Sequence, residues 1–119
     1  MTTPVFTQAP REEDVLVSEA NGSRSRDVIS ITSTSVDLAP GTPIGSTTTS
    51  AGTTFQTWAP GHPLVGLNLR TVEAGETEAV SVVRAAEVRD SAIIWPAAAT
   101  DPQIAAGRAS LATNGVIVR

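Results

Sequence analysis

The sequence predicts a mainly β protein that begins with a flexible arm and ends in one short α-helix. Short runs of Val, Ile and Leu are separated by Gly, Pro, Asn and Ser, which is typical of strands joined by tight turns. Only one segment, close to the C-terminus, carries both a helix start signal and a helix stop signal. The 119 residues are enough for one domain. We divide the chain into an arm, residues 1–14, and a single compact domain, residues 15–119.

The arm shows neither a helical nor a strand period. It contains two prolines and an acidic cluster at 12–14, and its only sizeable apolar side chains are Val5 and Phe6. Two interpretations remain open. The segment is either a disordered terminus or an arm that becomes ordered on a partner, with Val5 and Phe6 as anchors.

The first strands are expected to form a hairpin. Residues 15–17 are apolar, and residues 27–32 partly alternate between apolar and polar side chains. Between these runs lies Asn21-Gly22, a pair that favours the positive φ angles of a tight hairpin turn.

The next part of the chain is rich in turn-forming residues. Pro40-Gly41 fits a type II turn, and Pro43 disfavours a central strand position. Residues 46–54 are a low-complexity Ser/Thr stretch, which predicts a loop. A short strand is expected at 53–58.

Three more strands are expected before the helix. Residues 64–72 place Val65, Leu67 and Leu69 on one face and polar or small residues on the other. The acidic stretch 73–78 predicts a turn, 79–88 the longest strand, and 91–95 a further strand closed by proline.

The helix is predicted over residues 102–113. Asp101 is a suitable N-cap, Pro102 suits the first helical position, and Asn114-Gly115 provides a stop. Ile104, Arg108 and Leu111 lie near one side of this helix, and we expect that side to be packed. Residues 116–118 form a last strand that ties the C-terminus into a sheet.

The composition argues against an enzyme and against most ligand classes. With no cysteine and one histidine, the chain has no thiol nucleophile and few ligands for a transition metal, so we expect no catalytic, metal or cofactor site. The net charge of −4 argues against a nucleic-acid partner, and no apolar run is long enough to cross a membrane. Glu73, Glu76 and Glu78 lack the spacing of a calcium loop and are interpreted as a solvated turn. A small hydrolase acting through His62 is kept as an alternative.

The two tryptophans are the largest side chains. Apolar residues make up 40% of the chain but aromatic residues only 3%, so the core is light and gains from burial between subunits. We interpret Trp95, followed by Pro96, as an anchor of the core or of a subunit interface. A glycan- or receptor-binding module, in which sugar binding would perturb Trp58, is the second alternative.

The C-terminal third contains Ser91-Ala92-Ile93-Ile94-Trp95-Pro96, then Ala97-Ala98-Ala99-Thr100-Asp101, the short helix, and Asn114-Gly115-Val116-Ile117-Val118. In this order and spacing, these segments resemble the end of the head decoration proteins of lambda-like tailed bacteriophages, the protein D family. Two earlier stretches are similar to family members, Leu16-Val17-Ser18-Glu19-Ala20-Asn21-Gly22 and Leu38-Ala39-Pro40-Gly41-Thr42-Pro43-Ile44-Gly45.

This resemblance implies a β-clip-like fold and a non-enzymatic virion protein. It implies a homotrimer on the outer surface of the expanded phage head, at three-fold sites, where it stabilises the shell by binding the major capsid protein. It also implies a flexible N-terminal arm that adds to a capsid strand. In this chain the arm corresponds to residues 1–14, and its predicted capsid-binding residues are Thr3, Pro4, Val5, Phe6 and Thr7. Before assembly the protein would lie in the host cytoplasm.

Overall fold

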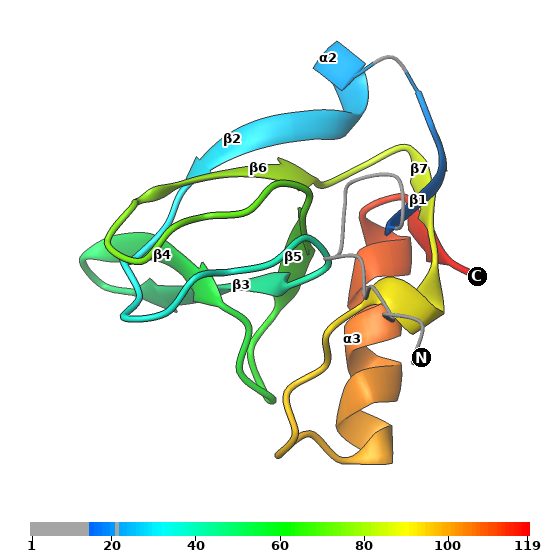
Figure 1. Cartoon of the computed structure of the whole chain (residues 1–119). Helices are drawn as coiled ribbons and strands as arrows, with labels where there is room; N and C mark the ends of the chain where they lie inside the picture. The colour runs from blue at the N-terminus through cyan, green and yellow to red at the C-terminus, as the bar shows by residue number, and fades with distance from the viewer. Residues whose placement is uncertain (1–14, 21) are drawn as a thin grey trace, which may run out of the picture.

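Two β-sheets and a C-terminal helix make up the computed structural model, which describes residues 15–20 and 22–119 (Figure 1). The three-stranded sheet has the order β1 (Leu16–Glu19), β7 (Ala86–Val88), β8 (Val116–Val118). The five-stranded sheet has the order β2 (Arg26–Ser30), β6 (Glu78–Val82), β5 (Leu64–Asn68), β3 (Pro43–Thr49), β4 (Gly52–Thr57). The helical segments are α2 (Gly22–Ser25), the 3-10 helix η1 (Asp90–Ala92) and α3 (Asp101–Thr113). The predicted mainly β class with a C-terminal helix is confirmed.

The five-stranded sheet curls until its two edge strands approach each other. Ile31, directly after β2, forms a parallel bridge with Phe55 in β4, and the Thr32 amide donates to the Phe55 carbonyl at 2.9 Å. The curled sheet encloses the smaller of two apolar clusters, which comprises Ile29, Ile31, Leu38, Ile44, Val72, Ala79 and Val83. We call this half of the molecule the barrel.

The larger cluster lies between α3, the three-stranded sheet and the outer side of the barrel. Its fully buried members include Leu64, Leu67, Val88, Leu111 and Val116, which come from both sheets and from α3. The cluster therefore joins the two halves of the domain. Figure 1 shows α3 alongside the three-stranded sheet and the barrel.

Helix α3 begins one residue earlier than predicted. Its N-cap is Thr100, whose hydroxyl accepts from the Gln103 amide, while the Gln103 side chain accepts from the Thr100 amide. This reciprocal capping box satisfies two helix-start donors and displaces Asp101 from the predicted cap position. The packed side of the helix is formed by Gly107 and Leu111, whereas Arg108 is exposed.

The predicted N-terminal hairpin is wrong. Strand β1 pairs antiparallel with β7, and β2 pairs antiparallel with β6 in the other sheet. The helical turn α2 separates the two strands. Glu19 at the end of β1 also binds the Arg26 guanidinium at the start of β2, which fixes the chain where it leaves one sheet for the other.

The predicted Ser/Thr loop at 46–54 is also wrong, because this stretch forms most of the β3–β4 hairpin. Threonine is β-branched and favours strands, and the hydroxyls of Thr48 and Thr53 lie 3.1 Å apart across the pair. Gly52 supplies a φ of +128° at the turn. Pro43 lies in an interior strand, contrary to prediction, but at its first residue, where the missing amide is tolerated.

The two strands predicted at 79–88 and 91–95 differ from the structure. The first is split into β6 and β7 by residues 83–85, where Ala85 adopts a φ of +52° and the chain passes from the barrel to the three-stranded sheet. The second begins in η1 and continues without a strand partner among the described residues. Its backbone is held by single contacts instead, such as the Ile94 amide donating to the Gly41 carbonyl at 3.0 Å.

Candidate functional site

Trp95 lies where the irregular segment after η1 crosses α3. Its indole packs edge-on against Trp58, with the ring centroids 5.7 Å apart and the planes at 73°. The Arg108 guanidinium lies 5.7 Å from the Trp95 ring centroid, within cation–π range. A Cβ at Gly107 would approach Cζ3 of Trp95 to 3.1 Å, so glycine at this helix position makes room for the ring. Trp95 and Pro96 are both half-buried, and Trp95 packs against the larger core cluster.

We expect Trp95→Ala to lower the free energy of unfolding by about 2–3 kcal/mol, somewhat less than the loss for a fully buried tryptophan. The substitution removes the contacts with Trp58, Gly107 and Arg108 while leaving the helix itself intact. Chemical denaturation followed by circular dichroism measures the change. Ile94→Ala, one residue earlier and 46% exposed, is the control and should change stability far less. Equal losses for the two variants would contradict the packing role of Trp95.

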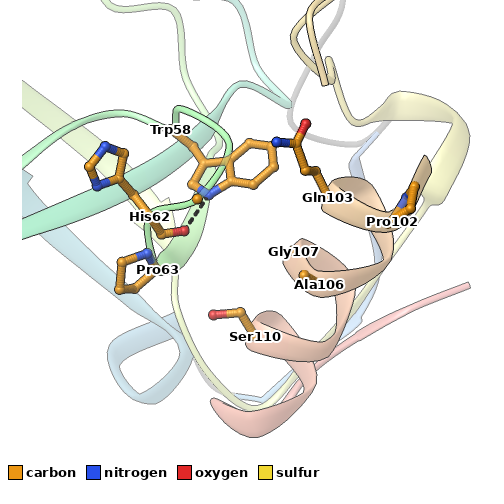
Figure 2. A pocket seen from close by; sticks show the side chains of 9 residues that line it. Trp58, His62, Pro63, Pro102, Gln103, Ala106, Gly107 and Ser110 are labelled. Atoms are coloured by element: carbon orange, nitrogen blue, oxygen red, sulfur yellow. Dashed lines mark hydrogen bonds between the residues drawn. The ribbon is translucent and has the colours of Figure 1, made fainter. Parts of the chain in front are cut away.

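A groove of about 500 Å³ lies between the 58–63 segment and the first turns of α3 (Figure 2). Trp58 forms its floor, with the indole Nε1 donating to the His62 carbonyl at 2.7 Å. Only 3% of the Trp58 surface is exposed, so its ring face is not presented for stacking on a sugar. The structure therefore gives no support to the glycan-binding alternative.

In the hydrolase alternative, His62 would have to activate a nucleophile, and Ser110, the serine that lines the same groove, is not aligned with it. Figure 2 shows the His62 imidazole turned away from α3 and from Ser110. The Ser110 hydroxyl donates to the Leu64 carbonyl at 3.0 Å and accepts from the Leu64 amide at 3.3 Å, so it ties α3 to β5. Within residues 15–20 and 22–119, no group of three His, Cys, Asp or Glu side chains is placed to hold a metal ion. In the same part of the chain, no helix is both long and apolar enough to cross a membrane.

The outer side of the three-stranded sheet carries exposed apolar side chains. Leu16, Val116 and Val118 contact the core, so the alternating residues Val17 and Ile117 point outward, where they are 46% and 41% exposed. Glu87 in the central strand faces the same way and pairs with Arg119 at 2.7 Å. We call Val17, Glu87, Ile117 and Arg119 the terminal face, because the first and last strands of the described chain border it (Figure 1).

The predicted arm, residues 1–14, precedes Val15, the first residue that the structure describes. Val15 is fully buried, and its carbonyl accepts from the Arg89 amide at 2.7 Å, so this point, which we call the root of the predicted arm, lies next to β7. Ile94, 46% exposed, lies near this root, because its amide binds Gly41 and the Gly41 backbone approaches Val15. The predicted capsid-binding residues, Thr3, Pro4, Val5, Phe6 and Thr7, lie outside the described residues. Val17, Ile94 and Ile117 are three of the five exposed large apolar side chains of the described chain.

Two ion pairs involve residues of the three-stranded sheet. The Arg119 hydrogen bond holds the pKa of Glu87 below its ordinary value of 4.5, and the same contact raises the pKa of Arg119. At the other end of β1, the Arg26 hydrogen bond lowers the pKa of Glu19, with smaller support from Ser25. Glu19 and Arg26 are mostly shielded from solvent, with side chains 20% and 19% exposed.

The Glu19–Arg26 pair predicts a loss of stability in acid. Because the folded-state pKa of Glu19 lies below 4.5, the pair contributes fully above that pH, and its contribution disappears as the pH falls through the lowered value. Glu19→Gln should therefore flatten the dependence of the unfolding midpoint on pH below about 4.5. Urea denaturation at several pH values measures this slope, with the exposed Glu78→Gln as control. A slope unchanged from wild type in Glu19→Gln would count against the pair.

Sequence reasoning did not identify the terminal face. Val17 and Ile117 belong to strands of four and three residues, too short for an alternating pattern to stand out. Val116-Ile117-Val118 is apolar throughout, so nothing in its residue pattern marks Ile117 as the outward-facing position.

The comparison with known protein families decides the class of protein. The chain matches the bacteriophage lambda head decoration protein D family over residues 5–116. It belongs to this family. No match was found among curated proteins. The chain is thus a structural protein of the phage capsid, and as a head decoration protein it associates with the phage head. The match covers the described domain up to β8 and also extends into the predicted arm.

Proposed function

We propose that the chain acts without catalysis as a homotrimer that binds the outer surface of the expanded phage head at three-fold sites and stabilises the shell. Its partner is the major capsid protein, and residues 1–14 form the binding arm. Before assembly, the protein lies in the host cytoplasm. The observation that carries this proposal is the match to the decoration protein family, together with the terminal face beside the root of the arm.

The terminal face fits a surface that becomes covered. Exposed Val17 and Ile117 flank an ion pair on a sheet whose other side is already packed against the core. An extended arm starting beside such a sheet can donate backbone hydrogen bonds to the edge of a capsid sheet while the face packs against the shell. The arm thereby determines which end of the domain turns towards the capsid.

A trimer can attach tightly to the head even if each of its arms binds weakly. An arm that becomes ordered on binding spends part of its interaction energy on that ordering, so one copy binds weakly. Three arms on one trimer raise the effective concentration at a three-fold site and strengthen attachment by about 10²–10⁴ fold. A protein that binds only the expanded shell also shifts the shell towards that state, which is the proposed basis of stabilisation.

Deletion of residues 1–14 should leave a folded trimer whose binding to heads is weakened by at least about 100-fold. The domain should survive, because Val15 and all described strands remain. Sedimentation of the protein alone reports the oligomeric state, and sedimentation with expanded, undecorated heads reports binding.

The full-length variants Val5→Ser and Phe6→Ser test the anchors individually, and Thr2→Ser is the matched control that keeps a small polar side chain. Binding should fall for the first two and stay unchanged for the third. Full occupancy of heads by the deleted protein would overturn the arm. A monomer in sedimentation would overturn the trimer.

A further inference from the structure

A polar pair lies inside the barrel, where the surrounding side chains are apolar. Asn68 in β5 and Ser81 in β6 are directly paired residues of an antiparallel ladder, and both are fully buried. Paired residues project from the same face of a sheet with their Cβ atoms about 4.5–5.5 Å apart. Ala79 and Val83, which share the strand face of Ser81, pack in the smaller cluster. The two polar side chains therefore point into the barrel interior.

Asn68 connects the barrel to the segment 38–42. Its Nδ2 donates to the carbonyls of Leu38 and Ala39 at 3.4 and 3.3 Å. Its backbone amide donates to the Thr42 carbonyl at 2.9 Å, and its own carbonyl accepts from the Gly41 amide at 2.7 Å. Gly41 in turn accepts from the Ile94 amide, so Asn68 holds the chain that positions the segment before Trp95.

Two polar atoms of this arrangement have no partner among the described residues, namely Oδ1 of Asn68 and Oγ of Ser81. Both Nδ2 contacts point towards backbone carbonyls, so the amide orientation is determined and Oδ1 is an acceptor without a donor. The Ser81 hydroxyl is a donor and an acceptor on the neighbouring strand. Buried polar atoms in folded proteins almost always find a partner, often an ordered water.

We propose that one structural water molecule binds between Asn68 Oδ1 and Ser81 Oγ. The water donates one hydrogen to Oδ1 and exchanges a second hydrogen bond with the Ser81 hydroxyl. A neutral ligand fits, because the site offers an amide oxygen and a hydroxyl and no carboxylate to balance a cation. The water completes the support of Asn68 and stiffens the 38–42 segment, which connects the barrel to the segment before Trp95. The proposal does not depend on the capsid-binding function.

A high-resolution crystal structure of the wild-type protein tests the site directly. We expect a density peak within about 3.2 Å of both Oδ1 and Oγ. In Ser81→Ala the density peak should be lost. The Gly41 amide should also exchange with solvent at least about fivefold faster, since the hydrogen bonds between Asn68 and the 38–42 segment open more readily. Ser110→Ala is the control, because it removes a hydroxyl that binds β5 from the other side.

Two results would overturn the proposal. One is wild-type density in which the Ser81 hydroxyl contacts Asn68 directly without a water. The other is a peak beside Asn68 that persists in Ser81→Ala with unchanged Gly41 exchange. The wild-type crystal structure decides the question even if Ser81→Ala does not fold.

Discussion

Gly41→Ala is expected to lower the free energy of unfolding by about 2–5 kcal/mol, from left-handed strain and overpacking together. Gly41 has a φ of +96°, and a Cβ at this position would lie 2.2 Å from the Ala92 carbonyl oxygen. The backbone cannot move away easily, because the Gly41 amide is bonded to Asn68 and its carbonyl to Ile94. Thermal and urea denaturation measure the loss.

Gly61→Ala is the matched control for this substitution. Gly61 has nearly the same φ, +95°, but a Cβ there meets no atom within 4 Å. Its alanine variant should therefore lose only the conformational part, about 1–2 kcal/mol. The difference between the two variants isolates the contact with Ala92. Equal unfolding midpoints would show that the segment before Trp95 does not press on Gly41.

Local chemistry was enough to predict the helix and the last strand. Pro102 and Asn114-Gly115 are signals that act within a few residues, and both ends of α3 lie where these residues place them to within one position. Residues 116–118 likewise form β8, tied into a sheet. Strand pairing was not predictable in the same way. Asn21-Gly22 is a strong hairpin signal, yet β1 and β2 each find a partner far along the chain, in different sheets.

The strand at 64–72 shows why burial patterns also fail. Its alternation places apolar residues on one face and polar or small residues on the other, but Gly66 and Asn68 on the second face are as buried as Leu67 on the first. The burial of these two residues results from tertiary contacts. A Cβ at Gly66 would meet the Val82 carbonyl oxygen at 2.5 Å, and Asn68 is inside the barrel with backbone carbonyls as partners. From its sequence, an interior strand that contains glycine and asparagine resembles a strand with one exposed face. Its full burial becomes evident only when the elements that cover both faces are known.

The resemblance predicted the family of the chain, whereas residue chemistry did not identify the terminal face. Trp95 stood out because large aromatic residues are rare in this chain, and it does lie against the core. The terminal face did not stand out, because Val17 and Ile117 are ordinary strand residues whose exposure depends on which side of the sheet α3 covers. A binding surface without catalytic groups leaves few local marks in a sequence.

Asn68→Asp should be at least as damaging as Gly41→Ala, with a loss of about 3–5 kcal/mol near neutral pH, as for a buried charge without a partner. The new carboxylate would face the carbonyls of Leu38 and Ala39, which in wild type receive the two Nδ2 hydrogens. Burial raises the pKa of such an acid, so the deficit is largest above the raised pKa. It shrinks as the pH falls towards about 4, the value in the unfolded chain.

Asn114→Asp provides the matched control, because it makes the same chemical change at the exposed C-cap of α3. A carboxylate there meets only the unfavourable end of the helix dipole, which costs about 0.3–1 kcal/mol. Urea denaturation at pH values between 4 and 8 should show a steep pH-dependent deficit for the first variant and a small, nearly constant one for the second. If the two variants gave matching curves of stability against pH, water would reach position 68, and the hydrogen bonds between Asn68 and the 38–42 segment would be open in solution. The segment before Trp95 would then lack the support that Asn68 gives it through Gly41.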